Sequence, residues 1–116
     1  MFMTGMEFLD AITSRVNTTE LDKLRQMLTD AQIPFEVYQD PAWKLMGGGY
    51  QIAYPSRDNR VCSAITHYGS YGADYGLIEI MGLLTEEEQS NDSVVGFLDA
   101  DEVFKRISDD WAMRKS

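Results

Sequence analysis

Apolar residues recur at intervals of three and four over the first third of the chain, a spacing that places them on one helix face. The first such group predicts a helix that begins near Met6 and carries Phe8, Leu9, Ile12 and Val16 on its apolar face. The polar run Asn17-Thr18-Thr19 interrupts this pattern. Two separate helices are therefore expected before the first strand.

The second helix is predicted to begin at Thr19, which suits an N-cap because Asp22 follows at the third helical position. It must end by Ile33, since Pro34 lacks a donor and disfavours helical geometry in the residue before it. The apolar face of this helix is expected to carry Leu21, Leu24, Leu28 and Ala31.

The middle of the chain changes to the alternation of apolar and polar residues that is typical of half-buried strands. Turn-forming residues separate these strands at Asp40-Pro41, at the flexible Gly47-Gly48-Gly49 and at residues 55–59. Strands are predicted at residues 35–38, 50–54, 60 to about 68, and 77–81, with the last of them at the centre of the sheet.

The last third returns to helical patterns. Thr85 with Glu88 forms a capping-box sequence, which predicts a short acidic helix that ends by Asn91-Asp92. Residues 94–98 predict a short strand or a buried connector. Asp99 is then expected to cap a final helix whose apolar face carries Val103, Phe104, Ile107 and Trp111.

These elements predict a single α+β domain over residues 1–116, with an antiparallel sheet of about four strands. The N-terminal helices and the C-terminal helix are expected to pack on one face of that sheet. A chain of 116 residues can bury one two-layer core. Its 44% hydrophobic and 25% charged residues are ordinary globular values.

The formal net charge of -9, from 10 basic and 19 acidic residues, excludes several classes of partner. A chain so acidic repels polyphosphate and anionic lipid, so direct binding to nucleic acid or to a membrane surface is not expected. No apolar window approaches the roughly 20 residues of a membrane span, and the N-terminus lacks the basic start of a signal peptide. The host-cell cytoplasm is therefore the predicted location.

The chain has one cysteine, Cys62, and one histidine, His67. A disulfide within the chain is thereby excluded, as are cysteine-based and histidine-rich metal sites. If one strand spans both residues, their odd separation places them on opposite faces, which argues against a thiol–imidazole pair. We therefore expect no catalytic residue, no metal, no cofactor and no enzymatic activity.

The first candidate site is the glycine- and tyrosine-rich stretch His67–Gly76. Its tyrosines offer large stacking surfaces with polar tips, and its glycines let a ligand approach the backbone. The stretch can stack a nucleobase or anchor a protein interface, and the alternative is a hairpin loop whose tyrosines cover the sheet edge. The binding residues predicted here are Tyr68, Ser70, Tyr71 and Tyr75.

Arg57 and Arg60 form the second candidate site, because they are the only basic residues between positions 49 and 84. Paired guanidinium groups can hold a phosphate or a carboxylate. They flank a turn that we expect to lie beside the tyrosine-rich loop. The alternative is a pair of surface arginines without a ligand.

The third candidate is an acidic surface in residues 85–116, which carry nine acidic and four basic residues. Such a surface can imitate the phosphate spacing of nucleic acid and block a basic groove on another protein. The alternative is helix capping and solvation. The residues assigned to this interface are Glu86, Glu87, Asp92, Asp101, Asp109 and Asp110.

A series of blocks over residues 50–107 resembles a family of small uncharacterised proteins encoded by bacteriophages and prophages. The blocks are Asn59–Cys62, His67–Gly72, Leu77–Glu88, Asp92–Leu98 and Glu102–Ile107. The resemblance carries over no catalytic residue. It implies a context, because small acidic phage accessory proteins often neutralise host defence by capping a defence protein or by absorbing its nucleotide signal.

The sequence therefore predicts a non-enzymatic, phage-type accessory protein that binds and inhibits a host defence factor. The expected target is a nucleic-acid-handling protein such as a CRISPR effector, which would make the chain an anti-CRISPR protein. The alternative is a small-molecule binder that sequesters a nucleotide immune signal, with the arginines on phosphate and the tyrosines on the base. A homodimer through a strand edge or the tyrosine-rich loop is left open.

Overall fold

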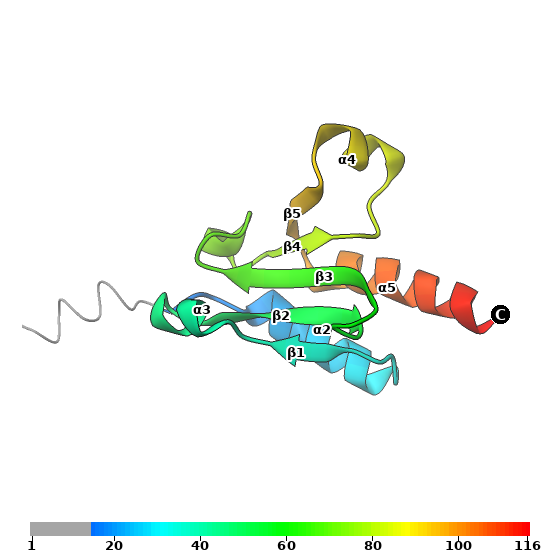
Figure 1. The fold of residues 1–116 in the computed structure, drawn as a ribbon, viewed down its shortest axis with the longest axis horizontal. Coiled ribbons are helices and arrows are strands. Elements are labelled where there is room, and N and C mark those ends of the chain that lie inside the picture. The colour runs from blue at the N-terminus through cyan, green and yellow to red at the C-terminus, as the bar shows by residue number, and fades with distance from the viewer. Residues whose placement is uncertain (1–14) are drawn as a thin grey trace, which may run out of the picture.

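The computed structural model describes residues 15–116 as an α+β fold, which confirms the predicted class (Figure 1). Most of the predicted first helix lies outside these residues, and its last residue, Val16, is not helical. The elements in chain order are α2 (Thr19–Asp30), β1 (Glu36–Tyr38), α3 (Pro41–Leu45), β2 (Gly49–Pro55), β3 (Arg60–His67), the 3₁₀ turn η1 (Ala73–Tyr75), β4 (Ile78–Met81), α4 (Glu86–Asn91), β5 (Val94–Leu98) and α5 (Ala100–Lys115).

The sheet is an antiparallel meander in which the strand order follows the chain, β1-β2-β3-β4-β5. It has five strands rather than about four, because residues 94–98 pair with β4 instead of forming a connector. The prediction that residues 77–81 form the central strand is wrong. Each strand joins beside the previous one, so β3 is central and β4 lies between β3 and β5.

One face of the sheet forms the core with α2 and α5, as predicted, and Figure 1 shows both helices behind the strands. Side chains alternate along each strand, so Ile52, Ala64 and Ile80, which lie opposite one another in register, all point to this face. Fully buried leucines of α2 and apolar residues of α5 fill the space against them. These helix residues are Leu21, Leu24, Leu28, Ala100, Val103 and Ile107.

Two tyrosines of β2 tie the sheet to the helices through their hydroxyl groups. Tyr50 donates to Asp22 of α2 at 2.6 Å, and the fully buried Tyr54 donates to Asp110 of α5 at 2.6 Å. Burial raises the pKa of both hydroxyls, and the acceptor carboxylates raise it further. Each hydroxyl thereby has an acceptor, so the Tyr54 ring can lie in the core and the partly buried Tyr50 ring can pack against it.

The helix starts differ in detail from the sequence prediction. Thr18, not Thr19, is the N-cap of α2, and the Asn17 side chain accepts hydrogen bonds from the backbone N–H and the hydroxyl of Thr19. At Asp40-Pro41, where a turn was expected, the short helix α3 begins. Asp40 Oδ1 accepts from the N–H of Ala42 at 2.8 Å, and proline suits the first helical position.

Arg106 of α5 fastens α4 to the rest of the fold. The predicted capping box is confirmed, since Thr85 Oγ1 accepts from the Glu88 N–H and Glu88 accepts from the Thr85 N–H. The Glu88 carboxylate also accepts two hydrogen bonds from the Arg106 guanidinium, at 2.7 and 2.8 Å. Arg106 donates in addition to the carbonyl of Leu83 at 3.0 Å. The predicted Asp99 cap of α5 is confirmed as well.

The Glu88 contact predicts a pH-dependent contribution to stability. The hydrogen bonds from Arg106 lower the pKa of Glu88 from 4.5 to about 2. Because the folded-state pKa is depressed, the contribution is present above about pH 4.5 and is lost as the pH falls towards 2. We expect Glu88→Gln to lower the free energy of unfolding by about 1 kcal/mol at pH 7.

Urea denaturation of both proteins at pH 7 and near pH 2.5 measures this difference. It should shrink at the lower pH, because Glu88 is protonated in the unfolded state there, and keeping it ionised in the folded state then opposes folding. Glu87→Gln is the matched control, because it removes one charge from α4 without touching Arg106. Equal effects of the two substitutions at pH 7 would contradict the assignment.

Candidate binding surfaces

The tyrosine-rich loop begins with a turn that closes on the end of β3. The backbone N–H of His67 donates to Ser70 Oγ at 3.0 Å, and the Ser70 hydroxyl donates to the His67 carbonyl at 3.0 Å. The Gly69 N–H donates to His67 Nδ1 at 3.0 Å. Ser70 is only 9% exposed. Its hydroxyl stabilises the turn, and a contact between Ser70 and a partner stays a prediction.

The loop then packs against β5. The Phe97 N–H donates to the Tyr71 carbonyl at 3.3 Å, and the Tyr71 N–H donates to Glu79 at 3.0 Å. Gly96 allows this approach, because a Cβ atom there would lie 2.2 Å from the Cβ of Tyr71. Backbone contacts therefore hold the loop on β5, so the aromatic side chains of Tyr71 and Tyr75 can remain exposed to solvent.

Three aromatic side chains gather where the loop meets β5. Tyr75 is 74% exposed, Phe97 is 58% exposed and Tyr71 is 54% exposed. The ring centroids of Tyr75 and Phe97 are 6.2 Å apart. Phe97 has a φ of 61°, in the left-handed region that a phenylalanine rarely adopts, and its side chain remains outside the core. Sequence reasoning found the tyrosines and missed Phe97, which lies in residues 94–98, predicted only as a short strand or a buried connector.

Exposed acidic residues of α4 lie at the other end of β5. The predicted acidic surface divides into two classes. On α5, three of its acids form ion pairs, Asp101 with Lys23, Asp109 with Lys105 and Asp110 with Arg114. The other three acidic residues lie in α4 or directly after it and form no ion pair with a basic residue in the described part of the chain. They are Glu86, Glu87 and Asp92.

β5 joins these two groups and, over the described residues, is an edge strand of the sheet, with its Phe97 N–H already bonded to the loop. It pairs only with β4 among the described strands, and Figure 1 shows the tyrosine-rich loop and α4 on either side of it. An edge strand presents unpaired backbone groups to which another chain can bind. We use the name β5 surface for this edge together with Tyr71, Tyr75, Phe97, Glu86, Glu87 and Asp92.

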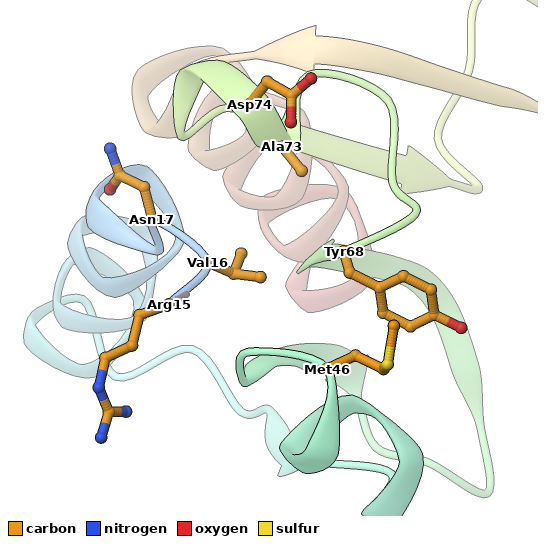
Figure 2. A pocket seen from close by; sticks show the side chains of 7 residues that line it. All are labelled: Arg15, Val16, Asn17, Met46, Tyr68, Ala73 and Asp74. Atoms are coloured by element: carbon orange, nitrogen blue, oxygen red, sulfur yellow. The ribbon is translucent and has the colours of Figure 1, made fainter. Parts of the chain in front are cut away.

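Tyr68 does not belong to the β5 surface. It lies beside Met46 at a hollow of about 340 Å³ whose lining also includes Asp74 of the loop (Figure 2). Arg15, the first described residue, lines the same hollow. The hollow thus borders the part of the chain that the structure does not describe, and no site is assigned to it.

Arg57 and Arg60 lie at the opposite end of the sheet from the tyrosine-rich loop. The eight residues of β3 separate them from it, which corresponds to roughly 23 Å along the strand. The prediction that they lie beside the loop is therefore wrong. They line a hollow of about 550 Å³ on the face that α2 and α5 leave uncovered, together with Glu36, Tyr38, Trp43, Gln51 and Asp58.

The single cysteine and the single histidine, which are common catalytic and metal-binding residues, both pack within the fold. Burial raises the pKa of the Cys62 thiol to about 12, so the thiol stays protonated in the core. Burial lowers the pKa of His67, which stacks on Trp43 on the uncovered face, opposite to Cys62 as predicted. Residues 15–116 contain no cluster of ligating side chains that could hold a metal ion. None of the helices over these residues combines the length and the apolar character needed to cross a membrane.

Comparisons with family models, with curated proteins and with solved structures find no match to this chain. The resemblance to phage-encoded proteins therefore stays a prediction. The function of the chain has to be inferred from its own residues.

The close packing of Gly96 under Tyr71 predicts that Gly96→Ala will displace the loop from β5. The added methyl group meets both the side chain and the backbone of Tyr71, so we expect a loss of about 1–3 kcal/mol in the free energy of unfolding. Faster hydrogen exchange of the Phe97 amide should accompany it. Gly69→Ala in the same loop is the control, since its nearest contact would be an ordinary 3.7 Å. An unchanged Phe97 exchange rate in Gly96→Ala would contradict this packing.

Proposed function

We propose that this protein acts by binding, and that its β5 surface docks onto a basic surface of another protein. The observation that supports this is the placement of exposed aromatic side chains beside unpaired acidic residues along a free strand edge. Each component has a separate part in recognition. The aromatic rings supply desolvated contact area, and the carboxylates supply charge complementarity.

Tyr75 and Phe97 are the proposed anchors, because among residues 15–116 they are the most exposed aromatic side chains, and their rings contact each other. Burying two such rings in a partner removes a large apolar area from water. The strand β5 is five residues long, roughly 17 Å, and it joins Phe97 near its end to the acidic α4 region before its start. One interface of standard size, about 800 Å² on each partner, can cover both groups.

The charges favour a partner that normally handles nucleic acid. A protein that binds DNA or RNA carries a basic groove, and an acidic surface competes for that groove. The resemblance to phage-encoded accessory proteins suggests a host defence factor, such as a CRISPR effector, as the partner. In this proposal the chain works in the cytoplasm of the host cell and prevents the defence factor from engaging its nucleic acid.

The proposal is tested by capture from a nuclease-treated bacterial lysate with the full chain immobilised. A basic nucleic-acid-binding protein should be retained, and excess duplex DNA should release it. The double variant Tyr75→Ala/Phe97→Ala should reduce retention at least about ten-fold, as expected when interface anchors are lost. Met113→Ala is the control, because Met113 is exposed near the end of α5, outside the β5 surface. Equal capture by the wild type and the double variant would exclude the β5 surface.

Association with the captured partner should also depend on salt. The on-rate should fall as the ionic strength rises, since steering between opposite charges is screened. Surface plasmon resonance between about 50 and 300 mM salt measures this. Glu86→Gln/Glu87→Gln should lower the on-rate and flatten its salt dependence.

Asp101→Asn/Asp109→Asn removes the same number of charges from acids that are already paired, so its effect should be smaller. An on-rate that does not respond to salt would contradict the proposed charge complementarity.

A further inference from the structure

The hollow lined by Arg57 and Arg60, on the sheet face that α2 and α5 leave uncovered, takes no part in the proposed docking of β5. It extends from the β2–β3 turn to Trp43, which stacks on His67 at the other end of β3, and it includes no residue of the β5 surface. Its volume of about 550 Å³ is in the range of small-molecule sites. Its lining brings together aromatic, amide, acidic and basic side chains from four segments of the chain.

Aromatic side chains form one wall of the hollow. The ring of Trp43 stands edge-on to that of Tyr38 at 5.8 Å between centroids, and it stacks on His67 at 4.8 Å. The Arg57 guanidinium lies 3.9 Å from the centre of the Tyr38 ring. These contacts fix the orientation of Trp43 and Tyr38 before any ligand arrives. A planar aromatic ligand can stack on such a wall.

Gln51 supplies a polar group at the floor. Its side chain is 9% exposed, and its Nε2 donates to Ser63 Oγ at 2.7 Å. Its amide oxygen makes no hydrogen bond to any residue between 15 and 116, and in this part of the chain no fully buried side-chain polar atom lacks a partner. The amide oxygen is therefore not fully buried, and because Gln51 lines the hollow, a ligand there could bond to it. A glutamine amide can pair with the edge of a purine, above all adenine.

The charged residues around the rim suit the two other parts of a nucleotide, its phosphate and its ribose. Arg57 and Arg60 can form bidentate hydrogen bonds with a phosphate. Glu36 is already engaged with the Arg57 N–H at 2.8 Å, which orients the turn. Asp58, in the turn between the two arginines, can accept hydrogen bonds from ribose hydroxyls.

We propose that this hollow binds a purine mononucleotide. The base stacks on Trp43, its edge meets the Gln51 amide, and the phosphate contacts Arg57 and Arg60. This assignment keeps the arginines that the sequence singled out and replaces Tyr68, Tyr71 and Tyr75 with Trp43 as the stacking residue, since Arg57 already lies over the Tyr38 ring. It stands independently of the β5 surface, because no residue is shared.

Adenosine monophosphate is the probe for this proposal. At about 10 mM it should raise the Tm by about 5 °C, because it binds the folded state only. Trp111→Phe leaves Trp43 as the only tryptophan, so fluorescence quenching in that variant reports stacking at the hollow directly. Arg57→Gln and Arg60→Gln should each weaken binding about ten-fold or more. Arg25→Gln is the matched control, since Arg25 also lies over a tyrosine ring, that of Tyr50, away from the hollow.

Four further ligands test the separate contributions of the base, the phosphate and the net charge. Adenosine and inorganic phosphate should each bind more weakly than adenosine monophosphate, and uridine monophosphate should bind more weakly because its ring is smaller. A 5′-phosphorylated oligonucleotide should also bind more weakly, since the net charge of -9 repels a polyanion. No Tm shift and no Trp43 quenching at 10 mM would overturn the proposal. So would equal affinity in Arg57→Gln and the wild type, or tighter binding of the oligonucleotide.

Discussion

The packing of α2 and α5 on one face of a five-stranded meander is the constraint from which the other features follow. Two helices supply enough apolar surface for one face of the sheet, and their buried leucine, valine and isoleucine side chains fill it. No described helix comparable to α2 or α5 covers the other face, and β5 ends the sheet without a further strand. The chain therefore has a stable core and two surfaces open to partners, the β5 surface and the hollow beside the β2–β3 turn.

The net charge of -9 overstates the number of acidic groups that a partner can contact, because several carboxylates make contacts within the fold. Asp22 and Asp110 accept hydrogen bonds from Tyr50 and Tyr54, and Glu88 binds Arg106. These carboxylates hold the helices to the sheet and α4 to α5, so they are not available to a partner. The acids that can meet a basic groove are fewer than the composition suggests, and α4 carries two of them in its first turn.

The sequence predicted the fold better than the sites, for reasons visible in particular residues. Local signals such as the Thr85–Glu88 capping box and the Asp99 cap act within four residues, so they could be read directly. The distance from Arg57 to the tyrosine-rich loop is set by the strand β3, which places them at its opposite ends. The spacing of apolar residues in the sequence does not encode that distance. Trp43 was missed because its importance arises from contacts across the sheet, with Tyr38 and His67. Phe97 was missed because its left-handed backbone turns it out of an apolar strand.

Hydrogen exchange of this chain in complex with its captured partner tests the central claim most directly. If the protein acts by docking the β5 surface, protection should appear at the amides of β5 and of the loop at residues 68–77. The amides of α2, which lie behind the sheet, should exchange at the same rates in the free and bound states. Protection confined to α2 or to the β2–β3 turn, with β5 unchanged, would contradict the claim that this edge is where the protein binds.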